Sequence, residues 1–172
     1  MLKKMFIILA NFFKSLKLKE FIGLIMIPIV ITLLLYFFGS SSIRNFNEFV
    51  DKFNSTVISI ASILGAFSLA SISIIITSSN ENIVEAKKTF TRRKDRNNKL
   101  ITYYKLQIMR NFFSLFVLFG LLIYAIAFTF IQNMLLDLSF AFYFETFLLF
   151  VAVFSQIFVI ESMYFLFVEI KK

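Results

Sequence analysis

The residues best placed to carry a function form a series of small, mostly hydroxylated side chains within one apolar segment. At 100° per residue on a helix they fall within an arc of roughly 80°. The series, here called the small-residue stripe, is Ser55, Ser59, Ser62, Ala66, Ala70, Ser73 and Thr77. Two interpretations are open: close packing of helices in lipid, or a wetted surface that lines a pore formed by several chains.

Glu161 is the second candidate because it is a charge deep within the last apolar segment. It precedes Lys171 by ten positions, about 15 Å along a helix, where a bare charge is costly in a bilayer. We expect Glu161 to pair with Arg110, and a proton- or ion-binding carboxylate is the alternative. Glu145 is expected at the outer membrane interface, where a carboxylate is well tolerated.

Most enzyme chemistry lacks its usual residues in this sequence. The chain has no Cys and no His, and only four Gly, which excludes thiolate or imidazole catalysis and phosphate-binding glycine loops. Its acidic residues are scattered, so no acid/base couple or two-metal site can be proposed from their spacing. We therefore predict no enzymatic activity, no metal and no cofactor.

The composition indicates an integral membrane protein. Of the 172 residues, 59% are hydrophobic and 16% are charged, against about 25% charged in ordinary globular proteins. We predict an all-α integral membrane protein with four transmembrane helices and a single membrane domain, residues 1–172. The predicted spans are residues 21–38, 56–77, 112–131 and 147–168.

Other segments have their own predicted roles. The Leu and Phe spacing in residues 1–20 predicts an N-terminal amphipathic interfacial helix, and Pro28 predicts a kink in the first span. Residues 39–55 read as a loop, with room for one short helix, and residues 138–144 as a short interfacial piece before the last span. Within a basic hairpin at 78–111, we expect an exposed turn at 92–98 and helix over 100–106.

The basic hairpin carries much of the net charge of +8. Its most concentrated basic residues are Lys87, Lys88, Arg92, Arg93, Lys94, Arg96 and Lys99. Because these residues flank apolar spans and no nucleic-acid-binding module surrounds them, we expect them to contact anionic lipid headgroups rather than nucleic acid.

The distribution of Lys and Arg predicts the orientation. Five precede the first predicted span, nine lie between the second and third, and two follow the last. Only Arg44 and Lys52 lie on the other side. By the positive-inside rule, both termini and the basic hairpin face the cytoplasm.

The order of elements resembles that of RexB-like phage-exclusion membrane proteins. The likeness lies in residues 59–123, where a Ser/Ala-rich span is followed by basic residues and then by Tyr103 and Tyr104 before the third span. The resemblance implies a homo-oligomeric effector in the bacterial inner membrane that conducts ions, depolarises the cell and answers to a cytoplasmic sensor protein.

Two alternatives stay open at this point. The size, basicity and four-span layout are also similar to those of colicin-type immunity proteins, which bind a pore-forming toxin in the bilayer. A non-catalytic subunit of a larger membrane complex is the other alternative.

Overall fold

The computed structural model describes residues 2–39, 45–132, 138–164 and 166–167. In this part of the chain, four helices are long and apolar enough to cross a membrane. They cover Leu18–Phe38, Phe46–Thr77, Tyr103–Ile131 and Leu138–Tyr164. The protein is therefore a multi-pass membrane protein, as its composition predicts.

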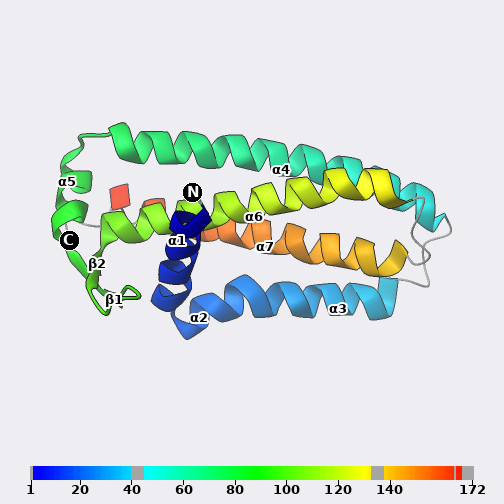
Figure 1. Ribbon diagram of the computed structural model, residues 1–172, viewed down its shortest axis with the longest axis horizontal. Helices are drawn as coiled ribbons and strands as arrows, with labels where there is room; N and C mark the ends of the chain where they lie inside the picture. Colours follow the sequence, from blue (N-terminus) through cyan, green and yellow to red (C-terminus); the bar gives the residue numbers. More distant parts are fainter. Residues whose placement is uncertain (1, 40–44, 133–137, 165, 168–172) are drawn as a thin grey trace. The chain divides into compact units, whose positions relative to one another are not determined.

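The first spanning segment is assembled from three helical pieces (Figure 1). The short helix α2 (Leu18–Phe21) leads into the π-helical turn η1 (Ile22–Met26) and then into α3 (Ile27–Gly39). The irregular turn ends at Met26, two residues before Pro28, which has no N–H to donate to the preceding helical turn. Proline thus disturbs the helix where the sequence predicts a kink.

The other three spanning helices are longer than their predicted spans. They are α4 (Phe46–Thr77), α6 (Tyr103–Ile131) and α7 (Leu138–Tyr164). Residues 46–55, predicted to be a loop, are part of α4, and the predicted interfacial piece at 138–144 continues into α7 without a break. The expected end of the last span at residue 168 and both chain termini lie outside the described residues.

The remaining elements are α1 (Leu2–Ser15), α5 (Glu81–Lys88), β1 (Phe90–Lys94) and β2 (Leu100–Thr102). Strands β1 and β2 pair antiparallel. The prediction of helix over residues 100–106 is wrong for 100–102, because β2 pairs with β1 and buries Ile101 against it. The Thr91 hydroxyl donates to the Ile101 carbonyl at 2.7 Å and holds the two strands together.

Two compact units are built from interleaved segments. Unit 1 comprises residues 1–18, 67–116 and 155–172, and unit 2 comprises residues 19–66 and 117–154. Helices α4, α6 and α7 each contribute residues to both units.

The core of unit 2 contains two apolar clusters. The first consists of Val57, Ala61, Leu118, Leu121, Ala125 and Ala152. The second consists of Val50, Phe128, Ala141, Phe142 and Tyr143. Small residues in the first cluster let the three helices approach closely, as is typical of helix packing in lipid.

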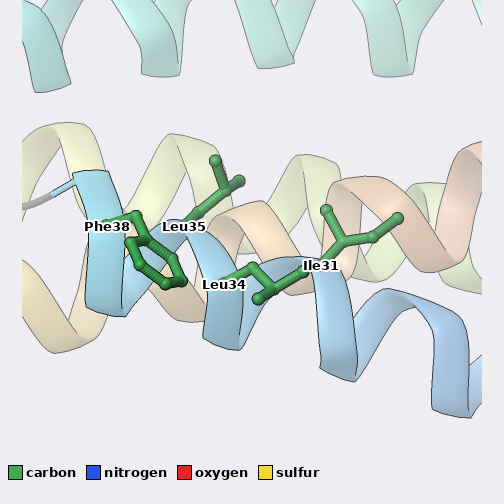
Figure 2. Close-up of a pocket in the computed structure, with 4 residues that line it drawn as sticks. All are labelled: Ile31, Leu34, Leu35 and Phe38. Carbon is green, nitrogen blue, oxygen red and sulfur yellow. The ribbon is translucent and has the colours of Figure 1, made fainter.

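Helix α3 of unit 2 leaves much of its surface uncovered. Figure 2 shows Ile31, Leu34, Leu35 and Phe38 around a shallow apolar pocket. Leu34 is 50% exposed and Phe38 is 76% exposed. This surface is suited to lipid or to a partner within the membrane.

Candidate functional site

Every member of the small-residue stripe is exposed on the surface of α4. The hydroxyl groups bond back to the carbonyl one turn earlier in the same helix, for example Ser62 to Ile58 at 2.8 Å and Ser73 to Leu69 at 3.0 Å. Ser55, Ser59 and Thr77 do the same. Since these hydroxyl protons are satisfied locally, the stripe is a smooth surface that tolerates lipid, a second helix or water.

The small residues on the other side of α4 point into the protein. Ala61 of unit 2 and Ser68 of unit 1 are both buried. Ser68 accepts a hydrogen bond from the Gln156 side chain of α7. The helix therefore has one small face that packs within the chain and one that is left open.

Unit 1 encloses polar side chains that the sequence analysis did not single out. The Ser114 and Ser155 hydroxyl oxygens are 2.9 Å apart, joining α6 to α7. Gln107 donates to the Val159 carbonyl at 3.3 Å, and Asn111 donates to the Gln107 carbonyl at 3.1 Å. Gln107, Asn111 and Ser114 recur every three to four residues, and this helical spacing is the signal that could have revealed them.

Glu161 is exposed on α7, and none of the ion pairs found between described residues links it to Arg110, so their pairing stays a prediction. The buried acidic residue is Glu145, which the sequence predicts at the membrane interface and which is fully buried in unit 2. Counting residues along a helix gives depth in the bilayer but not the direction in which a side chain points.

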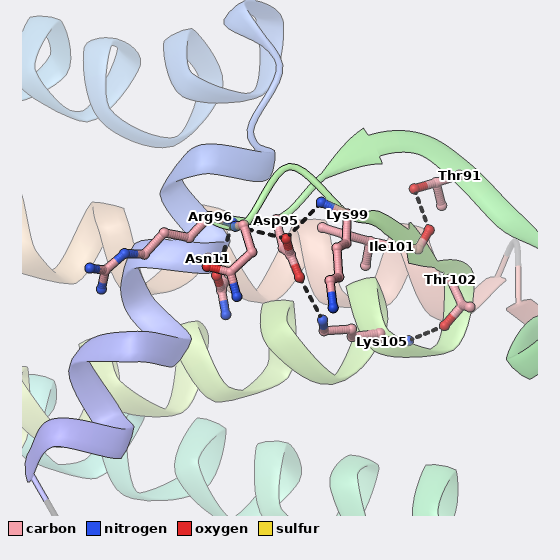
Figure 3. A network of polar contacts seen from close by, with 9 residues as sticks. Asn11, Thr91, Asp95, Arg96, Lys99, Ile101, Thr102 and Lys105 are labelled. Atoms are coloured by element: carbon pink, nitrogen blue, oxygen red, sulfur yellow. Dashed lines mark hydrogen bonds and ion pairs between the residues drawn. The ribbon is translucent and has the colours of Figure 1, made fainter.

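The turn between β1 and β2 is organised by Asp95 (Figure 3). Its Oδ1 atom accepts from the backbone N–H groups of Asn97 at 2.9 Å and Lys99 at 3.0 Å. Its Oδ2 atom accepts from Lys105 Nζ at 3.1 Å. The Lys99 N–H and then the Lys105 ammonium keep the pKa of Asp95 below its usual value.

Asn98 completes this turn with a φ of 58°, in the left-handed region that asparagine tolerates better than most residues. The Asp95 N–H donates to the Lys99 carbonyl at 2.9 Å and closes the hairpin. Because β1 extends to Lys94, the exposed turn that the sequence predicts at 92–98 begins only after residue 94.

Most basic residues of the hairpin point outward. Lys87, Lys88, Arg92, Lys94, Arg96 and Lys99 are exposed, and Arg93 is partly buried. Lys87 Nζ lies 4.9 Å from the centre of the Tyr104 ring, close enough for a cation–π contact. The exposed ammonium and guanidinium groups form a positive surface that can attract phosphate groups or acidic side chains.

Helix α1 is attached to the hairpin within unit 1. Arg93 Nη1 donates to the Ser15 carbonyl at the end of α1 at 2.9 Å, a favourable place for a cation. The Arg96 N–H donates to Asn11 Oδ1 at 3.1 Å, as Figure 3 shows. Phe12 stacks on Phe113 of α6 with ring centres 4.0 Å apart.

The stripe and the basic hairpin are therefore two exposed features with a distinct chemistry in the part of the chain that the structure describes. No family model matches this chain, and no curated protein or solved structure does either. The resemblance to RexB-like proteins stays a prediction from the sequence. In the described residues, no cluster of three or more acidic side chains could hold a metal ion.

Proposed function

We propose that this protein is an oligomeric membrane effector whose copies associate through α4 and conduct ions between them. The observation that carries the proposal is the small-residue stripe, which is exposed along α4 rather than used for packing within the chain. A continuous face of small, weakly polar residues suits either a close helix contact or a pore lining.

The packing of unit 2 supports a path between copies rather than through that unit. Val57, Leu121, Ala125 and Ala152 are fully buried in its first apolar cluster. Their side chains fill the space between α4, α6 and α7, so ions would have to pass along an outer surface. Several copies arranged around an axis would each contribute one α4 helix to such a passage.

The proposed orientation places both termini and the basic hairpin in the cytoplasm of a bacterial cell, with α1 at the membrane interface. The charge asymmetry of the sequence supports this orientation. The apolar side chains of Phe6 in α1 and Leu18 at the start of α2 are 69% and 75% exposed and would enter the headgroup layer. The exposed hairpin cations would bind anionic lipids or an acidic surface of a cytoplasmic sensor protein.

Thiol labelling tests the orientation directly because the chain has no cysteine. Proteins with a single Cys substitution at Ser41, Asn97 or Asn133 would be treated with a membrane-impermeant thiol reagent. The reagent would be added to inverted vesicles, which expose the cytoplasmic side, and separately to right-side-out vesicles, which expose the outside. We expect positions 41 and 133 to be labelled from outside and position 97 only from the cytoplasmic side. Labelling of position 97 from outside would overturn the orientation.

The biological role that we propose is depolarisation of the cell during phage defence or exclusion, as the resemblance implies. Its test is the membrane potential of bacteria, reported by a dye, after induction of the protein with and without phage challenge. We expect depolarisation in challenged cells that make the protein and none in cells with an empty vector. An unchanged potential under both conditions would contradict the proposal.

A colicin-type immunity protein is the second candidate, and the exposed face of α3 is the observation that favours it. Leu34, Leu35 and Phe38 are uncovered within a membrane-spanning segment and could contact helices of a toxin (Figure 2). This function predicts protection of cells from a pore-forming toxin with no depolarisation by the protein alone. The same potential measurement therefore separates the two candidates.

A further inference from the structure

Glu145 of α7 is a fully buried carboxyl group within a membrane-spanning helix of unit 2. Among the described residues, neither of its carboxylate oxygens has a hydrogen-bond partner. An ionised carboxylate in such a place would lack both a donor and a counter-ion, which is strongly unfavourable in a low-dielectric interior. The group must therefore be stabilised in some other way.

Two hydroxyl groups that bond to the turn of α7 just before Glu145 have their protons engaged. The Tyr124 hydroxyl donates to the Ala141 carbonyl at 3.0 Å, and the Thr146 hydroxyl donates to the Phe142 carbonyl at 2.9 Å. These two protons are therefore not available to stabilise a negative charge on Glu145.

The amide nitrogen of Asn54 in α4 is also engaged as a hydrogen-bond donor. Its amide nitrogen donates to the Ala125 carbonyl at 3.1 Å and to the Thr129 hydroxyl oxygen at 2.8 Å. Its Oδ1 atom is buried and accepts no hydrogen bond from the described residues. Asn54 therefore has its amide nitrogen engaged as a donor and its carbonyl oxygen free, and the Thr32 hydroxyl of α3 is a further buried polar group without a partner among the described residues.

Asn54 and Glu145 occupy corresponding places between the two apolar clusters of unit 2. On α4, Asn54 lies between Val50 of the second cluster and Val57 of the first. On α7, Glu145 lies between Phe142 of the second cluster and Leu148, which packs against the first. Each polar group is thus flanked along its own helix by residues of both apolar clusters.

The charged groups of the packed helices do not neutralise Glu145. The described cations of unit 2, Lys19 and Lys52, are exposed, and Lys52 pairs with Glu48 at 2.7 Å. The Asp51 carboxylate accepts from Gln132 at 2.5 Å. The remaining titratable groups of α3, α6 and α7 in this unit are tyrosines, namely Tyr36, Tyr124 and Tyr143.

We propose that Glu145 is a proton-binding site in the membrane interior. The carboxyl group carries a proton while α4, α6 and α7 pack as they do in unit 2. A neutral carboxylic acid avoids the cost of a buried charge that has neither a counter-ion nor a hydrogen-bond donor. Separation of the helices would admit water and release the proton to it. This inference is independent of the proposed pore.

Infrared spectroscopy of the protein in lipid tests the proposal directly. We expect wild-type protein at neutral pH to show the C=O stretching band of a protonated carboxyl, shifted in D₂O and lost in Glu145→Gln. The matched control Glu161→Gln alters an exposed carboxylate of the same helix and should keep the band. Arg44→Gln removes a cation that lies outside the described residues, and this variant should also keep the protonated-carboxyl band.

A second measurement covers the case in which Glu145→Gln does not fold. Wild-type protein with ¹³C-labelled glutamate side chains should show the same band at a lower frequency, because the heavier carbon slows the C=O stretch. The band then belongs to a buried glutamate, because exposed glutamates are ionised at neutral pH. Absence of any protonated-carboxyl band in wild-type protein would overturn the proposal. A carboxylate band of Glu145 that changes when sodium replaces choline would also overturn it, because the ligand would then be a metal cation.

The proposal also predicts the sign of a pH effect on stability. Above about pH 4.3 an unfolded chain has released this proton, whereas the packed helices keep it. The ratio of folded to unfolded wild-type protein should therefore fall as pH rises, by up to about tenfold per pH unit relative to Glu145→Gln. Equal pH dependence of the two proteins would contradict the assignment.

Discussion

Replacing Ala125 with leucine should destabilise the protein by about 1–3 kcal/mol, whereas the same replacement at Ala127 should have little effect. Ala125 is fully buried in the first apolar cluster of unit 2, where Leu121 and Ala152 also pack. A larger side chain there must push α6 away from its neighbours. It would also disturb the Ala125 carbonyl, which accepts a hydrogen bond from Asn54.

Ala127 is a matched control because it lies two residues further along the same helix and is exposed. Leucine at this position would face lipid, where added apolar surface meets no steric barrier, so the change should stay within about 0.5 kcal/mol. The measurement is the free energy of unfolding of the two variants in lipid nanodiscs. Equal effects at the two positions would show that the cluster is loosely packed.

The sequence reveals the spanning helices more clearly than it reveals their ends. Uncharged apolar runs are visible without structural information, but residues 46–55 look like a loop because they contain Glu48, Asp51 and Lys52. The structure shows that Val50 of the same segment is buried against α6 and α7 residues. Tertiary packing of one face, together with a Glu48–Lys52 ion pair on the other, extends α4 beyond its apolar run.

The hairpin shows the same limit for a different reason. Residues 100–102 follow a polar run and precede a helix, so their sequence alone favours an extension of that helix. Pairing with β1 depends on contacts ten residues away, such as the Thr91 to Ile101 hydrogen bond. Local sequence patterns do not contain that information.

The candidate sites divide in a similar way. Helical spacing groups the small-residue stripe on one face of α4, but it does not reveal which small residues of this helix are buried. The structure shows that Ala61 and Ser68, on the other side of α4, are buried while Ser62 and Ser73 are exposed. Likewise, the depth estimated from residue spacing points to Glu161 rather than Glu145 as the charge in the membrane interior. The direction in which each side chain points depends instead on how α7 packs.

The stripe leads to the prediction with the largest functional effect. Leucine at Ser62 or Ser73 should lower the conductance of the protein in planar bilayers by about tenfold or more, equal to about 1.4 kcal/mol or more in the barrier for ion passage. The apolar side chain would replace a small hydroxylated one at the proposed pore surface. Both residues are exposed and bond only to their own helix, so neither change should unfold the chain.

Thr56→Leu is the matched control for these variants. Thr56 is an exposed hydroxyl residue of α4 that bonds back to Lys52 at 2.9 Å, but it lies outside the arc of the stripe. It should leave both conductance and assembly size unchanged. Assembly size, measured by light scattering of the detergent-solubilised protein, then separates the two roles that small residues can play.

Unchanged assembly with lost conductance would show that the stripe lines the passage, because only the path for ions has been altered. Loss of assembly would show that the stripe is the contact between copies, since leucine prevents close approach of two helix backbones. If neither property changes, the locally bonded hydroxyls simply face lipid. In that case the exposed face of α3 becomes the better candidate for contact with a partner, and the immunity function is favoured over the pore.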